Sequence, residues 1–146
     1  MHPNIVLNYP AMIVSVIVAF FLGFLWYGPL FGKIWATGMG MKMDKKPDAA
    51  FMRRALGLQL LGICLVVFVL SHSIPVWRAS VWGIGTDQPD YVYGFFGGFF
   101  TWIGFYVPLQ LNKIAWEGRP WTVFFINAGH DFVNLQLISQ ILSHWH

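Results

Sequence analysis

Four polar residues near the C-terminus have the spacing of one helix face: Asn127, His130, Asp131 and Asn134. They stand at i, i+3, i+4 and i+7, and residues at these intervals lie on the same side of an α-helix. Carboxylate, imidazole and amide groups gathered in this way can pass a proton or hold a cation. This face is therefore the leading candidate for chemistry in the chain.

Asp131 is the one acidic residue inside a long apolar stretch, about halfway along residues 121–142. An ionised carboxylate in hydrocarbon is costly unless it is paired, hydrogen-bonded or beside water. In the functional interpretation, Asp131 titrates, His130 carries a proton, and Asn127 and Asn134 are neutral ligands. In the alternative interpretation, the same residues form a hydrogen-bond cluster that only fixes helix packing.

The elements that must position these residues are predicted to be transmembrane helices. The chain is 57% hydrophobic and 10% charged, whereas soluble domains are about 25% charged. Four apolar stretches without Lys, Arg or Glu approach the roughly 20 residues that a hydrocarbon core requires; they cover residues 10–31, 55–73, 91–111 and 121–142. We expect an all-α fold, an integral membrane four-helix bundle that forms a single membrane domain over residues 1–146.

The connections between these stretches differ in charge. Residues 32–54 contain six basic residues, residues 112–120 contain Lys113 and Arg119, and residues 72–90 contain only Arg78. The first and third connections must share a side, which the positive-inside rule places in the cytoplasm. Both termini are then outside (N-out/C-out). Because the basic residues flank apolar segments, we expect the lipid bilayer and no nucleic acid as a partner.

The third apolar stretch carries a stripe of small residues: Gly94, Gly97, Gly98, Thr101 and Gly104. Small residues let membrane helices approach closely, so the glycines predict a helix-packing face. Counting inward from the third connection, Thr101 and Asp131 lie at similar depth. We expect the stripe to face the polar side of the last helix, with Thr101 donating a hydrogen bond to Asp131. The alternative is a seam between copies of the chain.

The first apolar stretch ends in an aromatic turn made of Trp26, Tyr27, Gly28 and Pro29. Pro29 lacks a backbone N–H and Gly28 loosens the chain, so the helix is predicted to kink or end here. One interpretation is an interfacial aromatic belt with a helix stop. The other is a gate or a substrate-binding turn.

Metal, cofactor and catalytic motifs are weak or absent in the sequence. The predicted topology gathers four histidines outside, but no pair has the spacing of a known motif, so we predict no metal site; these weak candidates are His2, His72, His144 and His146. Cys64 is the single cysteine, which excludes an internal disulfide. Phosphate-loop, dinucleotide and nucleophile-elbow motifs are missing. We therefore expect no cofactor, no catalytic residue and no enzyme activity.

Two segments carry a family resemblance. Residues 26–33, Trp-Tyr-Gly-Pro-Leu-Phe-Gly-Lys, are followed by Trp35; later come Arg-Pro-Trp at 119–121 and Phe-Ile-Asn-Ala-Gly-His at 125–130. With the Asn8–Tyr9 entry and the glycine-rich third stretch, this pattern resembles a family of small bacterial four-helix membrane proteins catalogued as a domain of unknown function. The resemblance implies a multi-pass protein of the bacterial cytoplasmic (inner) membrane. It implies no reaction, ligand or catalytic residue.

Two functions remain open at this stage. The first is a non-catalytic accessory or assembly subunit, or helix-packing component, of a membrane complex. The alternative is a small proton- or cation-coupled channel or transporter that uses Asp131 and His130 at mid-membrane. A bundle of this size is too small to enclose a wide pathway alone, so we expect a homo-oligomer or a larger membrane complex.

Overall fold

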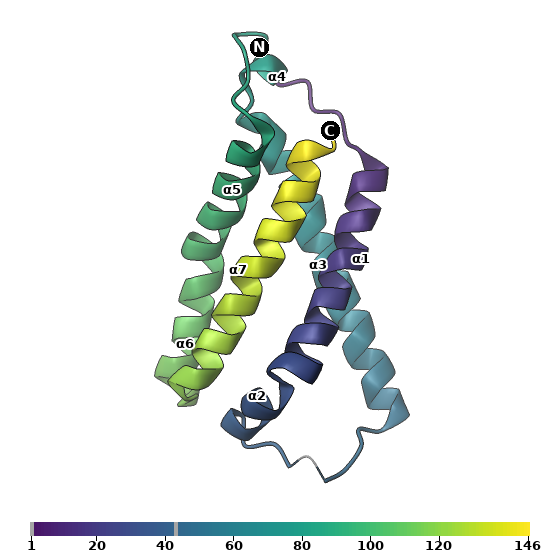
Figure 1. Cartoon of the computed structure of the whole chain (residues 1–146), viewed down its shortest axis with the longest axis vertical. Helices are drawn as coiled ribbons and strands as arrows, with labels where there is room; N and C mark the ends of the chain where they lie inside the picture. The colour runs from purple at the N-terminus through teal and green to yellow at the C-terminus, as the bar shows by residue number, and fades with distance from the viewer. Residues whose placement is uncertain (1, 43) are drawn as a thin grey trace.

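The computed structural model describes residues 2–42 and 44–146, and these residues form an all-α fold without strands, as predicted (Figure 1). The described residues form six continuous helices rather than the four expected. Four are long: α1 (Tyr9–Leu25) continued by η1 (Trp26–Leu30); α3 (Ala49–Val76); α5 (Asp90–Thr101) continued by η2 (Trp102–Tyr106) and α6 (Val107–Glu117); and α7 (Trp121–His144). Two short helices are added, α2 (Gly32–Gly38) and α4 (Ala79–Trp82).

Three of the long helices are long and apolar enough to cross a membrane: Tyr9–Leu30, Ala49–Val76 and Asp90–Glu117. Helix α7 does not reach the same mean hydropathy, although it is the most enclosed of the four. The helices also extend beyond the predicted stretches. The third continues to Glu117, which leaves only residues 118–120 as the connection predicted to cover residues 112–120.

Two prolines explain the two π-helical turns. Pro29 lies inside η1, and Pro108 follows η2 by two residues. A proline ring clashes with the carbonyl four residues earlier and offers no N–H to it, so the helix widens locally to keep its remaining hydrogen bonds. The predicted break at Pro29 is confirmed: the π turn ends at Leu30, and α2 begins after Phe31.

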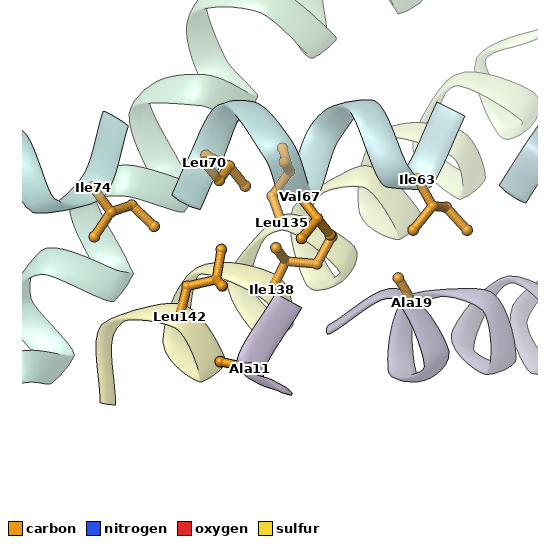
Figure 2. Close-up of a cluster of buried hydrophobic side chains, with 9 residues drawn as sticks. All are labelled: Ala11, Ala19, Ile63, Val67, Leu70, Ile74, Leu135, Ile138 and Leu142. Carbon is orange, nitrogen blue, oxygen red and sulfur yellow. The ribbon is translucent and has the colours of Figure 1, made fainter. Parts of the chain in front are cut away.

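The four long helices run alternately up and down, so that both termini and α4 lie at one end (Figure 1). The hydrophobic core occupies that end and joins residues of α1, α3 and α7 (Figure 2). Leu135 and Ile138 of α7 are fully buried against Val67 and Leu70 of α3. Helix α1 approaches closely because its buried face is small, with Ala11, Ser15, Ala19 and Gly23 at four-residue spacing.

The glycines of the third long helix divide between two neighbours. A β-carbon at Gly94 or Gly98 would lie within 2.6–2.8 Å of side chains of α7, so these two glycines permit the α5–α7 contact. A β-carbon at Gly97 would instead meet Ile74 of α3 at 3.0 Å. A β-carbon at Gly104 would meet no atom of another helix within 4 Å, so this glycine takes no part in the packing.

A buried arginine, Arg78, links the segments at the end of the bundle where both termini lie (Figure 1). The guanidinium of Arg78 lies 2.8 Å from Asp90 and 3.5 Å from Asp87, and it donates to the carbonyl of Ser143 at 2.7 Å. It also lies over the ring of Tyr93, 4.6 Å from the centroid. The connection between α3 and α5 is therefore folded onto the C-terminal end of α7.

Candidate functional site

A cavity of about 800 Å³ lies at the opposite half of the bundle from the hydrophobic core. Its walls come from α1, η1, α2, α3, α6 and α7. Helices α3 and α6 both line it but do not pack closely against each other. In Figure 1 the start of α3 splays away from α6 on the side where α2 lies. The cavity therefore separates these two helices.

The polar side of α7 lines this cavity through Asn127, His130 and Asp131. A directed chain of hydrogen bonds runs along it. The Tyr27 hydroxyl donates to Asn127 Oδ1 at 2.7 Å, and Asn127 Nδ2 donates to Gln110 Oε1 at 3.3 Å. Gln110 Nε2 then donates to Asp131 Oδ2 at 3.0 Å. The side-chain amides of Asn127 and Gln110 each accept a hydrogen bond through oxygen and donate another through nitrogen. The chain therefore leads from Tyr27, in the proline turn, to the carboxylate of Asp131.

Three indoles anchor α7 from both sides. Trp35 Nε1 donates to Asn127 Oδ1 at 3.1 Å. Trp26, the first residue of η1, donates to the carbonyl of Ile126 at 2.9 Å, and Trp102, the first residue of η2, donates to that of Ala128 at 2.8 Å. Both π-helical turns therefore fix the backbone of α7 just before His130. The two sequence segments at residues 26–35 and 125–130 meet in space.

The two ring nitrogens of His130 differ: Nδ1 lies near Asp131, and Nε2 has no partner among the described residues. Its Nδ1 lies 3.4 Å from Asp131 Oδ1, and its ring packs on Tyr27 with centroids 5.0 Å apart. Its Nε2 is buried and has no hydrogen-bond partner in the described part of the chain. When Nδ1 carries the hydrogen and donates it to Asp131, Nε2 presents a lone pair that can accept a proton.

Gln59 of α3 also lines the cavity near this nitrogen. A β-carbon at Gly23 would lie 2.6 Å from Gln59 Nε2 and 3.9 Å from His130 Nε2, so the amide, the imidazole and the bare glycine face one another. Charged residues line the end of the cavity where α6 turns into α7. Arg119 is 3.5 Å from Glu117 there, and Lys113 lies nearby on α6. Asp131 is thus the carboxylate among the neutral polar groups deeper in the site.

The predicted hydrogen bond from Thr101 to Asp131 is wrong. Thr101 Oγ1 donates to the carbonyl of Gly97 in its own helix at 2.7 Å, and Asp131 is bonded by Gln110 instead. The polar face of α7 is also divided. Asn134 is buried one turn beyond the cavity, and its Oδ1 has no partner among the described residues.

Sequence reasoning did not single out Gln110, Gln59 or Arg78 as parts of sites. A single neutral glutamine in an apolar stretch does not indicate which neighbouring helix it faces. Gln110 also lies next to the end of the stretch predicted over residues 91–111, so it was not expected at the depth of Asp131. The signal that could have found Gln110 is Pro108, because a proline within an apolar helix commonly marks a functional irregularity. Arg78 was noted only as the single basic residue of its connection, and its ion pairs with Asp87 and Asp90 of the same connection were not predicted.

The four histidines that were predicted to lie outside do not come together in a metal-binding group within the described residues. Across residues 2–42 and 44–146, no three His, Cys, Asp or Glu side chains are placed to hold a metal ion. His2 is exposed, and His72 and His144 each lie near a carbonyl of their own helix, that of Phe68 and that of Gln140. His146 Nε2 lies 3.1 Å from Asp90 Oδ1.

The chain belongs to a family described as "Protein of unknown function (DUF1761)", which matches residues 10–143. This finding confirms the resemblance to a domain of unknown function. No curated protein and no solved structure matches the chain. The family match covers all four long helices except the ends of the first and last, and thus every residue of the cavity.

Proposed function

We propose that this protein is a multi-pass protein of the bacterial cytoplasmic membrane with four spans and both termini outside. Three helices meet the length and hydropathy of a span. The proposal adds α7 as the fourth, because it packs against α1, α3 and α5, and a span enclosed by other helices can be less apolar than one facing lipid. The cavity then opens toward the cytoplasm, where the basic connections lie.

Within this topology, we propose a proton- or cation-coupled channel or transporter whose site is the His130–Asp131 pair. The observation that supports it best is His130 Nε2, which is buried beside a cavity and has no partner in the described residues. Asp131 would orient the imidazole through Nδ1 and stabilise its charge when Nε2 takes a proton. Gln110 and Asn127 would hold Asp131 and connect it to Tyr27. No step in this proposal requires catalysis.

The test is proton flux into liposomes that contain the purified protein, driven by a potassium diffusion potential and followed with an enclosed pH dye. Wild type is expected to acidify the lumen faster than empty liposomes, and Asp131→Asn is expected to match empty liposomes. Thr101→Val is the control, because the Thr101 hydroxyl donates to the carbonyl of Gly97 in its own helix and the residue lies outside the cavity lining. Flux that is absent in wild type, or unchanged in Asp131→Asn, would overturn the proposal.

A second candidate function is an accessory subunit of a larger membrane complex. The observation that favours it is an outward groove of about 630 Å³ between α3 and α5, lined by aromatic residues that include Trp77, Phe96 and Phe100. Another membrane helix could pack there. Native mass spectrometry of the protein purified in mild detergent tests this candidate: a stoichiometric complex with another subunit supports it, and a monomer or homo-oligomer contradicts it.

A further inference from the structure

We infer that the cavity binds a lipophilic organic cation, a bulky ammonium or phosphonium ion rather than a metal ion or an anion. This inference rests on the proposed cation-coupled function and names its ligand class. The volume of about 800 Å³ is within the range of about 300–1,000 Å³ that accommodates drug-sized molecules. A proton or a bare metal ion requires no such space.

The walls of the cavity supply the chemistry for such a cation. Aromatic rings line the side formed by the first helix and α2, through Phe20, Phe24, Tyr27 and Trp35. Aromatic faces attract organic cations that carry little hydration. Asp131 provides the opposite charge among the neutral amides of Gln110 and Asn127. The basic residues Lys113 and Arg119 lie farther away, at the end of the cavity where α6 turns into α7. A cation held near Asp131 would therefore have both a counter-ion and an aromatic enclosure.

The side toward α3 is mostly apolar and adaptable. Met52 and Leu56 line it beside the amide of Gln59, both are about 40% exposed, and Met39 joins them from the end of α2. Methionine side chains adjust to ligands of irregular shape. Because α3 and α6 stand apart in the half that contains the cavity, a ligand dissolved in the membrane can reach Asp131 from the side. This route suits a cation whose bulk is hydrocarbon.

Charge, rather than hydrophobicity alone, is expected to select the ligand. Two probes of closely similar shape separate these effects: tetraphenylphosphonium is a cation and tetraphenylborate is an anion. Binding of each to the detergent-solubilised full-length protein is measured by calorimetry. Tetraphenylphosphonium is expected to bind at least about tenfold more tightly, because the Asp131 carboxylate is mostly buried and attracts a cation more strongly there than in bulk water.

The variants assign that preference to one residue. Asp131→Asn is expected to weaken tetraphenylphosphonium binding by about tenfold while tetraphenylborate binding stays constant or improves. Asp131→Glu, which keeps the charge, is expected to retain the preference. Asp48→Asn is the matched control, because Asp48 is exposed at the start of α3 outside the cavity lining.

Equal affinity for the two probes, or a preference that survives in Asp131→Asn, would overturn the inference. Stronger binding of tetraphenylborate would also overturn it and would point to an anion held by Lys113 and Arg119. The outcome is separable from the proposed function. Asp131-dependent proton flux without a preference for tetraphenylphosphonium removes only the ligand class, whereas loss of both removes the proton site as well.

Discussion

The hydroxyl of Tyr27 donates to Asn127 Oδ1 at 2.7 Å, across 100 residues of sequence. This bond joins the π-helical turn at Pro29 to the polar face of α7, and Trp35 donates to the same oxygen. Asn127 is therefore the acceptor on which the aromatic turn depends. Neither interpretation of that turn from sequence, an aromatic belt or a gate, included its attachment to the last helix.

Replacing Asn127 by Leu is expected to destabilise the fold. The change leaves the Tyr27 hydroxyl and the Trp35 indole without their acceptor, at a cost of about 1–3 kcal/mol. Thermal unfolding in detergent, followed by tryptophan fluorescence, measures the effect. Asn134→Leu is the control, because Asn134 Oδ1 already lacks a partner among the described residues. If both variants lose stability equally, the hydrogen bonds to Asn127 do not stabilise the fold.

Two glycine substitutions in the third long helix distinguish a glycine required for helix contact from one that is not. Gly98→Ala is expected to destabilise by about 1–3 kcal/mol, because its β-carbon would lie 3.1 Å from the carbonyl oxygen of Leu135 and 2.8 Å from Gln136 Nε2. Gly104→Ala, with open space around the new atom, is expected to leave the melting temperature unchanged or raised. Equal behaviour of the two variants would contradict the described contact between α5 and α7.

Arg78→Met is expected to loosen the terminal end of the bundle. The variant removes the ion pair with Asp90 and the hydrogen bond to Ser143, which costs about 2–3 kcal/mol because the carboxylate is only partly buried. Arg53→Met, on the exposed start of α3, serves as the comparison. Hydrogen exchange is expected to rise in α4 and at the end of α7 in the first variant only. Protection unchanged from wild type would show that Arg78 does not hold these segments.

Acid is expected to weaken the same end of the protein. Hydrogen bonds from Ser80, together with Arg78, hold the pKa of Asp87 below its ordinary value of 3.8. A carboxyl whose pKa is lowered by folding adds stability above its ordinary pKa and loses it as the pH falls through the folded value. The difference in melting temperature between wild type and Asp87→Asn should therefore shrink below about pH 4. A difference that is constant down to pH 2.5 would contradict this assignment.

The sequence predicts the long helices well because lipid-facing helices need uninterrupted apolar residues. It also predicts the break at Pro29, since proline acts locally. The short helices α2 and α4 were not predicted, because each is embedded in a polar or glycine-rich connection where no hydrophobic pattern distinguishes a short helix from a loop. Helix α7 was predicted from the length of its apolar stretch. Its mean hydropathy is lower than that of the other long helices, and its polar residues are accommodated because other helices enclose it.

The site was predicted only in part. The spacing of Asn127, His130 and Asp131 places them on one face, because helical periodicity is a local property. The partner of Asp131 depends on where the hairpin turns. With the turn at residues 118–120 rather than 112–120, the position level with Asp131 moves toward the C-terminal part of the helix, and Gln110 rather than Thr101 reaches it.

The most direct test of the central claim is whether the cavity opens to water on the side of the basic connections. A cysteine at position 28 suits this purpose, because Gly28 lines the cavity and a new β-carbon there would meet no atom within 4 Å beyond the adjoining backbone. In a Cys64→Ser background, a membrane-impermeant thiol reagent is expected to label Gly28→Cys in inside-out vesicles and not in intact cells. Labelling from the outer side, or from neither side, would contradict a cavity that exposes the His130–Asp131 site to the cytoplasm.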